Sequence, residues 1–204
     1  MSSCCDDDGT AVALRESQRG TLYAVLVINA VMFLVIVIAA QFAKSTALFA
    51  DGLDNLGDAL TYGLSLIAVS SGASAKARVA LFKGVLILVA AGIVSAQIAY
   101  KLAYPSTPIF ELMGTFSVLG LAANSLCLLL LWRHRHEDIN MSSVWECSRN
   151  DIASNLSVFL AAGAVWLTGS GWPDVLVAIA LVTLLLRSSA RVISSAQAEL
   201  KVAT

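Results

Sequence analysis

The sequence predicts an all-α, polytopic membrane protein with six transmembrane helices. Hydrophobic residues make up 58% of the 204 residues and charged residues only 13%, whereas a soluble domain carries roughly 25% charged residues. The mean hydropathy is +0.79. The apolar residues also fall in long blocks, and the segment 21–43 contains no charge. Blocks that approach 20 apolar residues are long enough to cross a bilayer as helices.

Six spans account for these blocks. Their expected ranges are 20–43, 46–70, 79–101, 109–132, 142–168 and 173–193. They divide the chain into an N-terminal tail (1–19), a transmembrane domain (20–196) and a C-terminal tail (197–204). The N-terminus is polar and acidic and lacks the short basic start of a signal peptide, so we expect the first span to stay in the mature protein.

The distribution of Lys and Arg predicts the orientation. With the N-terminus in the cytoplasm, ten Lys and Arg residues fall in inner loops and tails, and only Lys44 and Lys101 fall outside. Cationic residues concentrate on the cytoplasmic side of membrane proteins. We therefore expect both termini in the cytoplasm. The membrane we expect is the bacterial inner membrane.

The second span carries three carboxylates in the stretch "ADGLDNLGDAL", at Asp51, Asp54 and Asp58. At about 100° per residue these side chains fall within an arc of about 60° on one side of a helix. Because lipid cannot solvate such a stripe, it must face protein or a water-filled cavity. The acids are therefore expected to point into the bundle.

The fifth span carries a second polar stripe in "CSRNDIASN", where Cys147, Asp151 and Asn155 recur every four residues. At 1.5 Å per residue, Asp54 and Asp58 lie about 12–18 Å from the outer end of their span. Cys147 and Asp151 lie about 8–14 Å from the inner end of theirs. In a hydrocarbon core of about 30 Å the two pairs can meet near the midplane.

Two i, i+4 pairs on facing helices offer four ligands for a tetrahedral divalent ion. The predicted ligands are Asp54, Asp58, Cys147 and Asp151, with Asn155 as an accessory residue. Asp51 is a further accessory candidate, which either binds the metal ion or lines the cavity. A thiolate favours Zn²⁺, Cd²⁺ and Co²⁺ over Mg²⁺ or Mn²⁺. An empty site with this much negative charge is expected to hold protons, which an entering metal ion must release.

The same motifs resemble the cation diffusion facilitator family of divalent-metal/proton antiporters. That family carries a His/Asp-x-x-x-Asp pair on its second helix and another on its fifth, and the matching pairs here are Asp54–Asp58 and Cys147–Asp151. The resemblance covers 20–196 and implies metal export in exchange for protons, no enzymatic activity and a homodimer. The chain departs from the usual pattern at Cys147, where His is common, and we expect it to be a core membrane domain without the cytoplasmic domain that usually follows the sixth helix.

Several alternatives stand beside this interpretation. A non-transporting metal sensor, a partner subunit of a transport system and a channel would each use an intramembrane site. Cys4 and Cys5, next to three aspartates, either capture a soft metal ion or belong to a disordered acidic tail. The expected partners are divalent metal ions, protons and the lipid bilayer, with no permanent cofactor and no nucleic acid.

An inverted repeat is also predicted. Asn29 precedes Asp54 by 25 residues, and Asn124 precedes Cys147 by 23. Two units of three helices each would have opposite orientations in the membrane, which is a common transporter design with the site at the interface between the units. Spans one, two, four and five would then form the bundle that holds the site.

Overall fold

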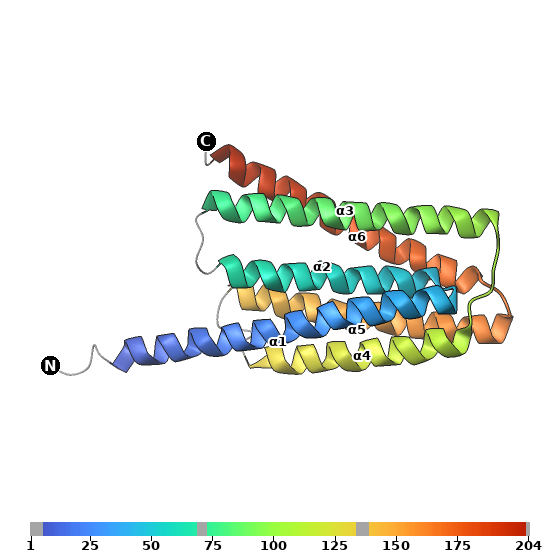
Figure 1. Ribbon diagram of the computed structural model, residues 1–204, viewed down its shortest axis with the longest axis horizontal. Coiled ribbons are helices and arrows are strands. Elements are labelled where there is room, and N and C mark those ends of the chain that lie inside the picture. The colour runs from blue at the N-terminus through green and yellow to red at the C-terminus, as the bar shows by residue number, and fades with distance from the viewer. Residues whose placement is uncertain (1–5, 69–72, 134–138, 203–204) are drawn as a thin grey trace.

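The computed structural model describes residues 6–68, 73–133 and 139–202, and within these ranges the protein consists of six helices without a strand (Figure 1). The helices are α1 (Asp6–Ala43), α2 (Thr46–Ala68), α3 (Ala73–Ala103), α4 (Phe110–Trp132), α5 (Ile139–Thr168) and α6 (Trp172–Val202). The predicted all-α class and the order of the six helices are confirmed.

The helices run beyond several of the predicted spans. α1 begins at Asp6 instead of residue 20, and α6 continues to Val202 instead of ending at 193. Hydropathy marks only the part of a helix that lies in hydrocarbon, while backbone hydrogen bonds extend the helix into water. From Asp6 onward the N-terminal tail is therefore helical, contrary to the disordered interpretation. Cys4 and Cys5 lie outside the described residues, so their predicted role in metal capture stays a prediction.

Five helices contain segments long and apolar enough to cross a membrane. These segments are Arg19–Ala43, Ala80–Ala103, Phe110–Trp132, Ser148–Thr168 and Trp172–Ala198. Large apolar side chains on them, such as Leu34, Phe42 and Leu129, are exposed at the surface of the bundle. Such a surface is suited to lipid rather than to water. The protein is thus a multi-pass membrane protein.

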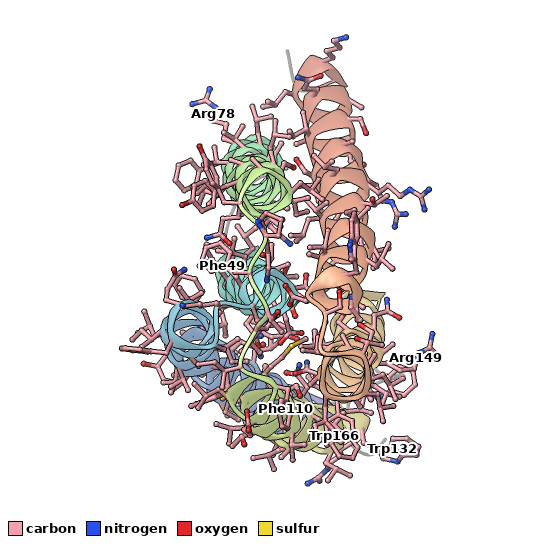
Figure 2. All side chains as sticks on the ribbon, turned by 90° about the vertical axis from the view of Figure 1, so that its right-hand side faces the viewer. Phe49, Arg78, Phe110, Trp132, Arg149 and Trp166 are labelled. Atoms are coloured by element: carbon pink, nitrogen blue, oxygen red, sulfur yellow. The ribbon has the colours of Figure 1, made fainter. Side chains whose placement is uncertain are left out.

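α2 is the remaining helix, and its three aspartates explain why it is the least like a lipid-facing span. It lies in the middle of the bundle (Figures 1 and 2) and contacts all five other helices. Its packing against α1 is close at Gly52, where a Cβ atom would lie 2.9 Å from Cγ2 of Val37. Because the other helices surround α2, its aspartate side chains can lie within the membrane without contacting lipid.

The helices pack as a four-helix bundle beside a helix pair. α1 packs most extensively on α2, α4 on α5, and α3 on α6, while α1–α4 and α2–α5 contacts close the bundle. The first, second, fourth and fifth helices therefore pack together as predicted, whereas their role in holding a metal ion stays a prediction. Both termini lie at the same end of the bundle (Figure 1). We call the opposite end the outer end, following the predicted orientation.

Candidate metal site

A layer of buried polar side chains separates two apolar clusters along the bundle. The larger cluster lies toward the outer end and includes Met32, Leu53 and Val158. The smaller one lies toward the termini and contains Leu22, Val25, Tyr62, Cys127 and Leu131. Between them, every helix of the four-helix bundle contributes buried polar residues: Asn29, Asn55, Asp58, Asn124, Asp151 and Asn155. Polar groups are costly inside a membrane, so a continuous layer of them indicates a site.

Two carboxyl groups meet across this layer. Asp151 of α5 is in hydrogen-bond contact with Asp58 of α2, and it also interacts electrostatically with Asp54 and Asp51. Asp58 and Asp151 are buried, whereas Asp54 is only partly buried. The predicted meeting of the acids on the second and fifth helices is therefore present in the structure.

Several oxygen atoms in and beside the layer have no hydrogen-bond partner among the described residues. They are both carboxylate oxygens of Asp51, Oδ2 of Asp151, and Oδ1 of Asn29 and of Asn155. Buried oxygens are normally paired, because leaving them unpaired costs free energy. All of these oxygen atoms are hydrogen-bond acceptors. They cannot pair with one another, but a bound cation can interact favourably with several of them at once. The chemistry of this layer therefore suits a positively charged ligand.

The asparagine side chains are held in matching ways on the two facing helices. Nδ2 of Asn55 donates to the carbonyl oxygen of Asp51 at 2.9 Å, and Nδ2 of Asn155 donates to that of Asp151, also at 2.9 Å. On α1, Nδ2 of Asn29 donates to the carbonyl oxygen of Val25 at 2.9 Å. In each case a backbone contact occupies the amide nitrogen. At Asn29 and Asn155 the unpartnered amide oxygen is thereby left as the available polar atom.

Gly120 of α4 provides the room that Asn155 needs. A Cβ atom at position 120 would overlap Oδ1 of Asn155, while a Cβ atom at Gly163 would meet nothing within 4 Å. We expect Gly120→Ala to weaken metal binding about 10-fold, because Asn155 must move. Gly163→Ala is the matched control and should bind like wild type, since it adds the same methyl group to open space. Equal affinities in titration calorimetry would exclude a role for the Asn155 position.

The structure does not complete the predicted ligand set. Cys147 lies on α5 one turn before Asp151, but its side chain is outside the described part of the molecule. Among the described side chains, no three His, Cys, Asp or Glu residues are grouped closely enough to hold an ion. The assignment of Asp54, Asp58, Cys147 and Asp151 as ligands therefore stays a prediction, as does the accessory role of Asp51 and Asn155.

One polar cluster was not predicted from the sequence. Lys101, counted there as an outer-loop charge, is buried and forms an ion pair with Asp174 at the start of α6. The available signal was weak: each residue is an isolated charge close to the outer end of a span. Two such charges on the same predicted side of the membrane are candidates for pairing.

Buried carboxyl groups inside a bundle of apolar helices are typical of membrane proteins that bind or move cations. The chain belongs to the cation efflux family, because residues 22–200 match the profile described as the cation efflux transmembrane domain. This match spans all six helices and confirms the resemblance to the cation diffusion facilitators. A comparison with curated proteins found no match. The family consists of metal cation transporters rather than enzymes.

Proposed function

We propose that the protein exports divalent cations of the Zn²⁺, Cd²⁺ and Co²⁺ class from the cytoplasm in exchange for protons. The contact between Asp58 and Asp151 inside a buried polar layer is the observation that carries this proposal. Two carboxyl groups can form a hydrogen bond only when one of them carries a proton. A divalent ion that binds both oxygens must displace that proton, so metal and proton occupy the same atoms in alternation.

The proposed ligands divide into two kinds. Asp54, Asp58 and Asp151 supply hard oxygen donors that also carry protons, and Cys147 supplies a soft thiolate. The thiolate would bias the site toward Zn²⁺, Cd²⁺ and Co²⁺. The unpartnered oxygens of Asp51 and Asn155 support accessory roles, as a neighbouring acid and as a neutral oxygen donor.

The direction of transport follows from the proposed orientation. With both termini in the cytoplasm of a bacterial cell, metal ions enter the bundle at the end that carries the termini. Protons then enter from the outer end and reload the carboxyl groups after the metal has left. Cys4 and Cys5 would bind metal at the cytoplasmic entrance, and a homodimer is the proposed assembly.

Proteoliposomes test the proposal directly. With the membrane potential clamped, an acidic lumen should drive uptake of Zn²⁺ or Cd²⁺, and the lumen should become more alkaline as metal enters. Asp151→Asn provides the matched control for leak, because it removes one of the two contacting carboxyl groups and nearly preserves side-chain volume.

The rival functions give different results in the same vesicles. A channel would pass metal in response to voltage without needing the pH gradient. A metal sensor or a partner subunit would show neither metal uptake driven by the pH gradient nor metal uptake driven by voltage. Metal uptake that does not depend on the pH gradient would contradict the proposed exchange.

A further inference from the structure

A second polar cluster lies at the outer end, away from the candidate metal site. The carboxylate of Asp174 accepts four hydrogen bonds: from Oγ of Ser45 at 2.6 Å, from Nζ of Lys101 at 2.6 Å, and from the backbone N–H groups of Thr46 and Ala47 at 2.9 and 3.0 Å. Asp174 is fully buried and Lys101 is 7% exposed. We call these residues the outer cluster.

The outer cluster joins helices that are distant in the sequence. Asp174 belongs to α6, Lys101 to α3, and Thr46 is the first residue of α2. Asp174 thus caps the N-terminus of another helix, whose free N–H groups and helix dipole favour a negative charge. Nζ of Lys101 also donates to the carbonyl oxygen of Lys44 at 2.7 Å, which fixes the α1–α2 turn. The start of α2 is therefore attached to the α3–α6 pair.

The acids of α2 lead toward this cluster. Asp58, Asp54 and Asp51 lie on one side of the helix, in order of decreasing distance from its outer end. Asp51 is less than two turns from Thr46, and both of its carboxylate oxygens are buried without a partner among the described residues. A cation that leaves the Asp58–Asp151 level toward the outer end would pass Asp54 and then meet the unpartnered oxygens of Asp51.

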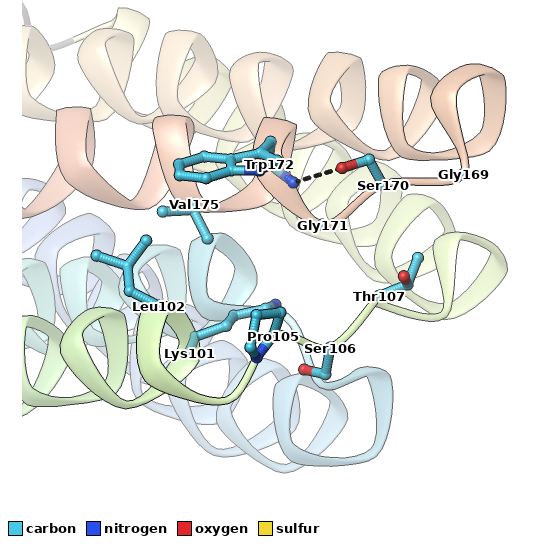
Figure 3. Close-up of a pocket in the computed structure, with 10 residues that line it drawn as sticks. All are labelled: Lys101, Leu102, Pro105, Ser106, Thr107, Gly169, Ser170, Gly171, Trp172 and Val175. Atoms are coloured by element: carbon cyan, nitrogen blue, oxygen red, sulfur yellow. Dashed lines mark hydrogen bonds between the residues drawn. The ribbon is translucent and has the colours of Figure 1, made fainter.

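The outer cluster borders a pocket. This pocket of about 270 Å³ lies between the end of α3 and the start of α6 (Figure 3). Its lining includes Lys101, Ser106, Trp172 and Val175. Lys101 thus lines the pocket and also donates to Asp174. The outer cluster thus includes the start of α2, less than two turns from Asp51, and it also borders this pocket through Lys101.

We propose that Asp174 and Lys101 form the outer gate of the metal release path, with the pocket as its exit vestibule. This inference rests on the proposed function, since a gate requires a transported ion. The structure is closed at this gate. Release requires Asp174 to give up its bonds to the start of α2, and it requires the Lys101 ammonium, which repels a divalent cation, to move aside.

Thiol labelling in intact cells tests the gate without measuring transport. The reporter is Ala50→Cys, which is buried next to Asp51, and the reagent is a membrane-impermeant charged methanethiosulfonate added outside. The background has Cys4, Cys5 and Cys127 replaced by Ser, and the same background without the reporter is the blank. Ser106→Cys, at the exposed pocket, serves as the positive control for sidedness and folding.

The expected result is that Asp174→Asn increases the labelling rate of the reporter at least about 10-fold, because asparagine can neither pair with Lys101 nor favour the N-terminus of α2 with a charge. Glu111→Gln is the matched control. It removes an exposed carboxylate from the outer end of α4, outside the cluster, and should not change the rate.

An unchanged rate in Asp174→Asn, with normal labelling at Ser106→Cys, would overturn the gate. If Asp174→Asn does not reach the membrane, the labelling rate of the reporter is measured in Lys101→Met instead. This variant removes the ammonium group but leaves Asp174 to cap α2, and an unchanged rate in it would likewise overturn the gate. Labelling of Ser106→Cys only from the cytoplasmic side would also overturn the proposal. Failure of proton-driven uptake by wild type in liposomes would instead reject the proposed function, so the two failures are distinguishable.

Discussion

Replacing Asp58 with asparagine is expected to weaken metal binding by about 100-fold or more, which corresponds to roughly 2.7 kcal/mol. The substitution nearly keeps the volume of the side chain but removes a negative charge from the contact with Asp151. Asp51→Asn is the matched control, because it makes the same chemical change on the same helix, two turns away. Titration calorimetry on purified protein should show a much smaller loss for Asp51→Asn.

The pH dependence of binding follows from the same contact. Protons and metal compete for the carboxyl oxygens, so lowering the pH favours the proton-loaded site and weakens apparent metal affinity. Each proton released on binding changes the apparent dissociation constant by about 10-fold per pH unit, as linkage requires. Wild type should therefore bind more tightly at pH 8 than at pH 6. Asp58→Asn, which has one titrating group fewer, should show a flatter dependence.

Calorimetry in buffers of different ionisation enthalpy counts the released protons. The observed heat changes with the buffer only when protons leave the protein. Wild type should release at least one proton per metal ion, and Asp58→Asn should release fewer. Release of none by wild type would rule out exchange at this site, even though the chain belongs to the cation efflux family.

The membrane architecture could be predicted because it depends on local properties of the sequence. Apolar blocks give the spans, and the spacing of Asp51, Asp54 and Asp58 places them on one side of a helix. Antiparallel helices of known direction then bring Asp58 and Asp151 to similar depth. The structure confirms this arrangement. It could be predicted because each step depends only on helix geometry and on the free-energy cost of exposing acids to lipid.

Contacts that depend on tertiary packing were not predictable in the same way. Lys101 and Asp174 are 73 residues apart and belong to the α3–α6 pair, whose packing no local pattern reveals. The overlap that a side chain at Gly120 would make with Asn155 depends on how closely α4 approaches α5. Both contacts position polar groups, and both required the structure.

Two further residues near the candidate site show the same dependence on packing. Cys127 belongs to the smaller apolar cluster, and its Sγ accepts a hydrogen bond from Nδ2 of Asn29 at 3.6 Å, so it borders the polar layer. The guanidinium of Arg149 lies 5.4 Å from the ring centre of Trp145. Arg149 points away from the bundle (Figure 2), which places it outside the candidate site.

Replacing Cys147 with histidine is expected to shift preference from Cd²⁺ toward Zn²⁺ by about 10-fold, or roughly 1.4 kcal/mol. Imidazole is a harder ligand than thiolate, so the softer ion loses more when the sulfur is removed. The substitution also gives α5 the His-x-x-x-Asp pair that is common in the family, so binding of Zn²⁺ itself should persist.

Uptake of both ions into proteoliposomes, by wild type and Cys147→His, measures the ratio. Cys127→Ser is the matched control: it removes a buried thiol from the neighbouring apolar cluster and should leave the Cd²⁺/Zn²⁺ ratio unchanged. A loss of Cd²⁺ preference in both variants would assign the effect to bundle packing. An unchanged ratio in Cys147→His would remove Cys147 from the ligand set and leave a site built from the carboxylates alone. The intramembrane site would then have no physical basis for selecting soft ions, because oxygen ligands do not favour Cd²⁺ over harder cations.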